Sequence, residues 1–101
     1  MLDKFKQLYD LQKKAKEIQK ELKDTEIEAK SDDGTVSVVI NGEQHIVDVK
    51  IDPSVLSAER KDQLEKTIVK VMAEAISQAQ AMAAEKTKGV MKDLGVNLPG
   101  M

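Results

Sequence analysis

A chain of 101 residues with one Phe, one Tyr and no Trp can build one small domain, whose core must come from aliphatic side chains. It has no cysteine, so disulfides and thiolate metal sites are excluded. The formal net charge of −2 argues against a basic, nucleic-acid-binding surface spread over the whole molecule. Because a chain this short buries little area by itself, we expect it to form an oligomer.

The charge is unevenly distributed along the chain. Residues 1–24 hold seven lysines and five acidic residues, a local charge of +2, whereas 25–57 hold two lysines and seven acidic residues, a local charge of −5. Residues 58–101 hold seven basic and six acidic residues, a local charge of +1. A polyanion would therefore meet the two ends of the chain and avoid its middle.

The N-terminus carries no long apolar run, which predicts that it is not a signal peptide. No segment approaches the roughly 20 apolar residues that a membrane span needs. We therefore expect a cytoplasmic protein with no membrane contact.

Residues 3–24 are predicted to form the first helix. Its apolar side chains recur at alternating spacings of three and four residues, as in a coiled-coil seam: Leu8, Leu11, Ala15, Ile18 and Leu22. Lysines gather on the opposite side of the helix: Lys6, Lys13, Lys16, Lys20 and Lys23. This lysine side is either a solvated surface or a set of phosphate contacts, and the pattern alone leaves both open.

Three strands are predicted to follow, at 25–30, 35–40 and 43–51, in a one-sided antiparallel meander. A four-residue loop at 31–34 would pair Ile27 with Val38. The same loop would pair Ala29 with Val36. Apolar alternation places these four side chains on an inner face, whereas on the outer face only Val39 and Ile46 are apolar.

The second hairpin contains Asn41-Gly42, which is typical of a two-residue type I′ turn with φ > 0 at both positions. That turn would set Val38 opposite His45 and Val36 opposite Val47. His45 is the only histidine, and we interpret it as a rim residue with a local hydrogen bond, because no second ligand lies at a workable spacing for a metal.

Asp52-Pro53-Ser54 ends the third strand, and Ser57 is the predicted N-cap of a second long helix that runs to about residue 94. A wide stripe of apolar and small side chains, including Ile76, Ala79 and Ala83, runs along this helix. At 1.5 Å per residue the helix reaches roughly 50 Å, so its C-terminal half must project beyond the sheet or pack on a second copy. Gly95 would end it, giving a single domain over 1–95 and a flexible tail over 96–101.

Catalysis finds little support in the sequence. No phosphate-binding, dinucleotide-binding or nucleophile-elbow motif occurs, and His45 has no evident partner. We expect no enzyme activity, no catalytic residue, no metal, no cofactor and no small-molecule substrate.

Phe5 and Tyr9, one helical turn apart, could stack or wedge against bases. Packing of this pair against a partner's helix is the favoured interpretation.

Several segments together resemble one protein family. They are the helix–three-strand–helix order, Gly34-x-Val36-x-Val38-x-x-Asn41-Gly42, Ile51-Asp52-Pro53-Ser54-x-Leu56, and the closing Leu98-Pro99-Gly100-Met101. Over nearly the whole chain the sequence is similar to the YbaB/EbfC family of bacterial nucleoid-associated proteins. The resemblance implies an α+β fold that forms a tweezer-like homodimer, and binding of DNA in the cytoplasm to bend, compact or regulate the chromosome.

The resemblance also implies that the ends of both long helices contact DNA. By region and charge, the corresponding side chains here are Lys4, Lys6 and Lys13 on the first helix and Lys86, Lys88 and Lys92 on the last. With Lys16 and Lys20 of the lysine side they form the predicted DNA-binding set. The predicted dimer or core set gathers seam, sheet and stripe residues: Leu8, Leu11, Ile18, Val39, Ile46, Ile76, Ala79 and Ala83.

We therefore predict a homodimer that binds duplex DNA with little sequence preference, because no base-reading constellation is visible. The alternative is a protein-interaction module, a helical-arm chaperone or adaptor whose seam and Met72, Met82 and Met91 grip a client. A scaffold subunit in a recombination or replication assembly is a third possibility.

Overall fold

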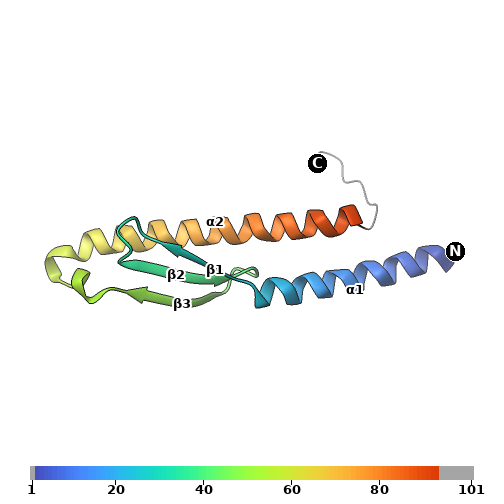
Figure 1. Cartoon of the computed structure of the whole chain (residues 1–101), viewed down its shortest axis with the longest axis horizontal. Helices are drawn as coiled ribbons and strands as arrows, with labels where there is room; N and C mark the ends of the chain where they lie inside the picture. Colours follow the sequence, from blue (N-terminus) through green and yellow to red (C-terminus); the bar gives the residue numbers. More distant parts are fainter. Residues whose placement is uncertain (1, 94–101) are drawn as a thin grey trace.

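A long helix, three strands and a second long helix follow one another along the chain (Figure 1). The computed structural model describes the backbone of residues 2–93 and the side chains of residues 4–93. Its elements are α1 (Leu2–Asp24), β1 (Glu26–Lys30), β2 (Val36–Asn41), β3 (Ile46–Ile51), the short 3-10 helices η1 (Pro53–Val55) and η2 (Ala58–Arg60), and α2 (Lys61–Asp93). The predicted fold class is confirmed: the strands form one antiparallel sheet in the order β1-β2-β3. The predicted tail 96–101 and the predicted helix end at Gly95 lie outside the described residues.

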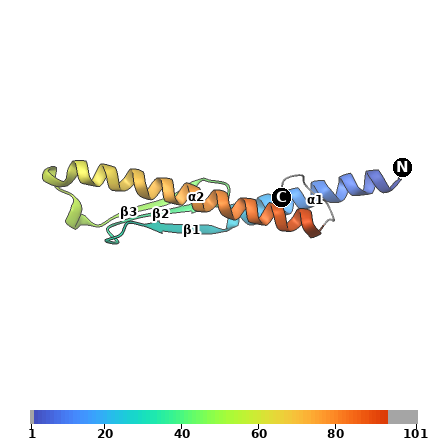
Figure 2. The ribbon, with the colours of Figure 1, turned by 90° about the horizontal axis from the view of Figure 1, so that it is seen from above.

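The molecule is elongated, with principal extents of 68 × 26 × 15 Å. α2 lies along one face of the sheet and continues past its end, where α1 extends in the same direction (Figures 1 and 2). The two helices run antiparallel there, and the N-terminal end of α1 reaches past the last described residue of α2. We call this extension, formed by α1 and residues 82–93 of α2, the arm.

The core lies between α2 and the first two strands. The buried side chains of the sheet are Ala29, Val36, Val38 and Ile40. From α2 they meet Val71, Ala75 and Ala79, which are spaced four residues apart and therefore share one side of the helix. Small alanines allow the helix to approach the sheet closely. β3 stays outside this core, since five of its six residues are exposed and only Ile51 is half-buried.

The first hairpin differs in register from the prediction. Ala29 is paired with Val38, and Ile27 with Ile40, because the loop begins one residue later than expected. The Ser31 amide donates to the Val36 carbonyl oxygen at 2.8 Å, so Ser31 extends the ladder and does not belong to the turn. The pairing shifts by two residues, which keeps every apolar side chain on its predicted face.

Asp33 holds the loop of this hairpin in place. Its Oδ1 atom accepts hydrogen bonds from Ser31 Oγ at 2.8 Å, from the Thr35 amide at 3.1 Å and from Thr35 Oγ1 at 2.7 Å. The Thr35 hydroxyl, then the Ser31 hydroxyl and the Thr35 amide, lower the pKa of Asp33 from 3.8 to about 2.

Acid should weaken this loop in a defined range of pH. Because the folded pKa of Asp33 lies below its unfolded value, its contribution to stability is complete above about pH 4 and is lost as the pH falls towards 2. Thr35→Val removes the strongest donor and should raise the pKa of Asp33 towards 3.8, measured from the NMR shift of its carboxyl carbon. An unchanged midpoint in the variant would show that the hydroxyl does not set the pKa.

The second hairpin also departs from the prediction. Asn41 and His45 flank a three-residue loop in which Gln44, not Gly42, has a positive φ of 67°. The Asn41 carboxamide Oδ1 accepts from the amides of Glu43 at 2.9 Å and His45 at 3.0 Å, which stabilises the longer loop. The prediction of a two-residue turn is therefore wrong, and so is the predicted pairing of Val38 with His45.

The observed register pairs Val38 with Val49 and Val36 with Ile51, four residues from the prediction. An irregularity between Val39 and Ile40 then sets Ile46 opposite the buried Ile40. Directly opposed residues lie on one face of a sheet, so the predicted outer-face position of Ile46 is wrong. Val39 is half-buried.

The predicted capping residues before α2 are confirmed. Asp52 Oδ1 accepts from the Ser54 amide at 2.8 Å and caps η1, and this hydrogen bond lowers the pKa of Asp52. Ser57 Oγ accepts from the Arg60 amide at 3.2 Å and caps η2, which leads directly into α2. The long helix therefore begins one short turn later than predicted.

Candidate nucleic-acid interface

The arm is joined to the sheet where three elements meet. The Gly42 amide donates to the carbonyl oxygen of Leu22 at 2.7 Å and to that of Thr25 at 3.1 Å. A Cβ atom on Gly42 would lie 2.8 Å from the Leu22 oxygen and 2.7 Å from Met82 Cε on α2. Gly42 is therefore required by the close approach of α1, the hairpin loop and α2, and not by its φ angle.

An ion pair links the two helices of the arm next to this junction. Lys86 Nζ on α2 lies 3.3 Å from Glu21 Oε2 on α1, and the Lys86 side chain is only 31% exposed. Lys86 thus belongs to the predicted DNA-binding set but already has an acidic partner. A phosphate would have to compete with Glu21 for this ammonium group.

Four lysines of α1 form what we call the lysine face: Lys6, Lys13, Lys16 and Lys20. All four side chains are exposed. Within the described part of the chain, none of them lies in an ion pair, whereas the neighbouring Lys14 pairs with Glu17 at 3.4 Å. Their spacings of seven, three and four residues keep them within one sector of the helix. The face presents free ammonium groups along the length of the arm.

The remaining predicted lysines point elsewhere. Lys4 lies four residues before Leu8, so it continues the row of the apolar seam and stands apart from the lysine face. Lys88 and Lys92 are exposed, one turn apart, on the side of α2 away from Lys86. The predicted set is therefore one face on α1, a second cluster on α2, and two residues, Lys4 and Lys86, in different surroundings.

The apolar seam of α1 borders a groove between the two helices of the arm. Its volume is about 210 Å³ and its lining includes Leu11, Ala15, Ile18, Val90 and Met91. Ile18 is half-buried, whereas Leu8 remains 58% exposed. α2 thus covers the seam only near the sheet.

A second uncovered apolar surface lies beside the core. Val47 and Val49 of β3 are 49% and 38% exposed, and Val69 and Ile76 of α2 are 69% and 38% exposed. Val69 and Ile76 are seven residues apart and share the flank of α2 opposite the β1–β2 loop. We call these four residues the open apolar face. Of the predicted dimer or core set, Ile76 belongs to it, Ala83 is half-buried, and Ala79 is buried inside the single chain.

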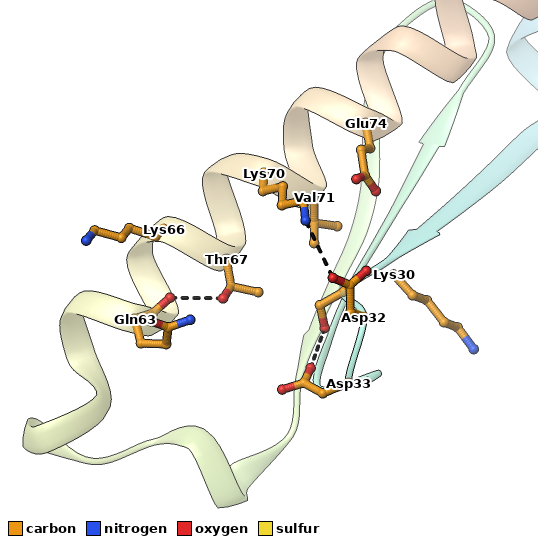
Figure 3. Close-up of a pocket in the computed structure, with 10 residues that line it drawn as sticks. Lys30, Asp32, Asp33, Gln63, Lys66, Thr67, Lys70, Val71 and Glu74 are labelled. Carbon is orange, nitrogen blue, oxygen red and sulfur yellow. Dashed lines mark hydrogen bonds and ion pairs between the residues drawn. The ribbon is translucent and has the colours of Figure 1, made fainter.

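A further hollow lies between the β1–β2 loop and α2, far from the lysine face (Figure 3). Its volume is about 260 Å³, and acidic and basic side chains mix in its lining. Lys70 Nζ lies 3.5 Å from Asp32 Oδ2, so that cation already has a partner, and Lys66 and Lys30 point away (Figure 3). The hollow has none of the converging cations that would suit a phosphate.

Other kinds of site find no support in the described residues. No cluster of acidic or histidine side chains over residues 4–93 could hold a metal ion. His45 is exposed, and its main chain is held by Asn41. In the same part of the chain, no helix has the length and apolarity needed to cross a bilayer.

Comparison with known proteins identifies the chain. The sequence model of the YbaB/EbfC DNA-binding family matches residues 1–94. A nucleoid-associated protein of Dictyoglomus thermophilum is 37% identical over 95 residues, which are 94% of this chain and 89% of the relative. A nucleoid-associated protein of Clostridium acetobutylicum is 33% identical over 99 residues, or 96% of this chain and 85% of the relative.

A solved structure has the same fold. The crystal structure of an uncharacterized protein from Helicobacter pylori matches with a TM-score of 0.70 and 25% identity, over 82% of this chain and 96% of that one. Fold and relatives together define a small α+β protein of the nucleoid-associated class. The chain belongs to the YbaB/EbfC DNA-binding family.

Several important residues could not be found from sequence patterns. Glu21 lies on α1 and Lys86 on α2, and only the fold brings the two side chains together. Asn41-Gly42 predicted a type I′ turn in which Gly42 has a positive φ. The structure instead requires glycine there because α1 and α2 lie too close for a Cβ atom. Val49 is 38% exposed, and no local sequence pattern shows that α2 leaves this part of the sheet uncovered.

Proposed function

We propose that this protein binds duplex DNA as a homodimer, with the lysine face and the Lys88–Lys92 cluster contacting phosphates. The observation that carries the proposal is the row of exposed ammonium groups, which have no ion-pair partner among residues 4–93, on a projecting arm in a member of a DNA-binding family. The sheet region, with a local charge of −5 over residues 25–57, would face away from the duplex.

Little sequence preference is expected of such an arm. Every cation of the predicted set is a lysine, a point charge that suits phosphates, whereas bidentate base contacts favour arginine. The only arginine, Arg60, lies in η2 at the opposite end of the molecule (Figure 1). We place the protein in the cytoplasm on the nucleoid, as a single domain over 1–95 with a tail over 96–101.

The open apolar face supports the homodimer. Val47, Val49, Val69 and Ile76 are uncovered beside the core of a chain with little buried area. A second copy that packs on this face by two-fold symmetry would remove these side chains from water and hold two arms on one particle. Two arms also raise the affinity of weak phosphate contacts through their effective concentration.

Substitution within the open apolar face tests the dimer. Val49→Lys should fold, because the side chain is 38% exposed in the single chain, but it would bury a charge in the dimer. Sedimentation velocity should show dimers for the wild type and monomers for the variant. Asp48→Lys, one residue away on the other face of β3, should remain dimeric. Equal masses for the wild type and Val49→Lys would exclude this interface.

A gel shift tests DNA binding. The wild type should retard random-sequence duplexes of equal length with similar affinities at low salt, and the Val49→Lys monomer should bind them more weakly, because it lacks the second arm. A wild type that retards no duplex would contradict the proposal.

The ion pair between Glu21 and Lys86 provides a gain-of-function test. Glu21→Gln should release Lys86 for a phosphate, raise the affinity for duplex DNA and steepen the salt slope by about 0.9 for each added contact. Stability should fall by less than about 1 kcal/mol, because the Glu21 side chain is 64% exposed and water screens its ion pair with Lys86. Glu17→Gln removes the same charge from the neighbouring Lys14 pair and is the matched control. Equal slopes for Glu21→Gln and wild type would show that Lys86 takes no part in binding.

A protein-interaction module is the second candidate, favoured by the apolar groove of the arm. Only Met91 of the three methionines expected to grip a client lines this groove. Met82 packs at Gly42, and Met72 packs against the core. The client-binding surface is thus smaller than the sequence suggested, which leaves DNA binding as the better-supported function.

A further inference from the structure

The only two aromatic residues of the chain lie side by side in solvent. Phe5 and Tyr9 are one turn apart on α1, so their rings share one side of the helix. They are 70% and 67% exposed. The end of α1 that carries them extends past the last described residue of α2 (Figures 1 and 2). We call Phe5 and Tyr9 the aromatic pair.

The surroundings of the aromatic pair indicate what covers it. Lys6 precedes Tyr9 by three residues and Lys13 follows it by four, so both flank its ring. Lys16 lies one further turn along the same side, and all three lysines are exposed. An apolar partner helix on this surface would strip water from several ammonium groups without replacing their contacts, which is unfavourable.

The apolar seam does not compete for the same surface. Leu8 and Leu11 lie roughly 100° and 160° away from Tyr9 around the helix, at 100° per residue. A helix that packs on the seam or in the groove therefore leaves the aromatic pair uncovered. A ligand that combines planar apolar groups with closely spaced negative charges would satisfy both the rings and the lysines, and nucleic acid has this chemistry.

We propose that the aromatic pair stacks on bases of bound duplex DNA and gives the protein a preference for sites where base stacking is already weak. The inference rests on the duplex binding proposed above. Lysines on either side would hold the backbone while a ring enters a base step and kinks the duplex. Entry is easiest at mismatches and at flexible pyrimidine–purine steps, where less stacking is lost.

A pair of oligonucleotides tests this preference. One is a fully matched duplex, and the other carries a single central mismatch at the same length and salt. The wild type should bind the mismatched duplex about tenfold more tightly, since opening the stack is easier there. Phe5→Gln with Tyr9→Gln keeps the charge of α1 and does not lower its helix propensity. It should reduce the preference to less than about twofold, with unchanged salt slope on the matched duplex.

The fluorescence of Tyr9 gives an independent readout. It is the only tyrosine in a chain without tryptophan, so tyrosine emission reports on this one ring. Stacking should quench it on the mismatched duplex, and Tyr9→Trp, excited where DNA does not absorb, provides a second reporter. Phosphate contacts alone would leave the ring in water and its emission unchanged.

The outcomes separate the two proposals. Binding of both duplexes with equal affinity and unquenched Tyr9 emission would overturn base stacking and leave phosphate binding intact. A mismatch preference that survives in the double glutamine variant would also overturn it. A wild type that binds neither duplex would overturn duplex binding and, with it, the stacking inference.

Discussion

Lys13→Glu combined with Lys20→Glu should weaken binding of random-sequence duplex DNA by more than tenfold at low salt. Both side chains belong to the lysine face and are exposed. In a dimer the change affects four lysines, so the slope of log affinity against log salt should become shallower by roughly 3 to 4, at about 0.9 for each lost phosphate contact. The urea midpoint should change little, because neither residue packs against the core.

A matched control separates local contacts from net charge. Lys50→Glu with Lys66→Glu changes the charge of the chain by the same amount, but these exposed residues lie on β3 and near the start of α2, away from the arm. This control should retain most of the affinity and the wild-type salt slope. Equal losses in the two double variants would mean that overall charge, and not the arm, governs binding.

Gly42→Ala should destabilise the protein by about 1–3 kcal/mol, the usual effect of forcing extra volume into a packed site. The added Cβ would lie 2.8 Å from the main-chain oxygen of Leu22 and 2.7 Å from Met82 Cε. The methionine can move, but the Leu22 oxygen is the acceptor of the Gly42 amide, so relief of the contact breaks that hydrogen bond and displaces α1. Urea denaturation measures the loss.

The same substitution at a second glycine, Gly89, should have the opposite effect on stability. Nothing lies within 4 Å of a Cβ built on Gly89, which sits within α2. Gly89→Ala should therefore stabilise the protein by up to about 1 kcal/mol through its higher helix propensity. If Gly42→Ala proved as stable as the wild type, the junction between hairpin and arm would not be the tight contact described here.

The sequence predicts the faces of the sheet correctly, except at Ile46, but it does not predict the register. Apolar alternation fixes the side of each strand that meets the core, and the errors of two and four residues in pairing preserve that side. The register depends on loop chemistry that several side chains share. Asp33 with Thr35 closes one loop, and the Asn41 carboxamide closes the other. A dipeptide such as Asn-Gly does not predict these hydrogen bonds.

For the candidate site, the sequence predicts the lysine face because helical periodicity depends only on local spacing. It does not predict that Lys86 meets Glu21, because that contact joins residues 65 positions apart and requires the packing of α2 along the sheet. The sequence does not predict the open apolar face for the same reason, because its exposure depends on where α2 packs on the sheet. Val49 and Val36 follow the same alternation, yet α2 covers only the latter.

The central claim is that a dimer holds duplex DNA through the lysines of its arms. The most direct measurement is the affinity of the wild type for one random-sequence duplex over a series of salt concentrations. We expect a linear fall of log affinity with log salt and a slope between about −4 and −8, which corresponds to roughly four to nine phosphate contacts per dimer. A slope close to zero, with binding that persists as salt rises, would contradict the claim.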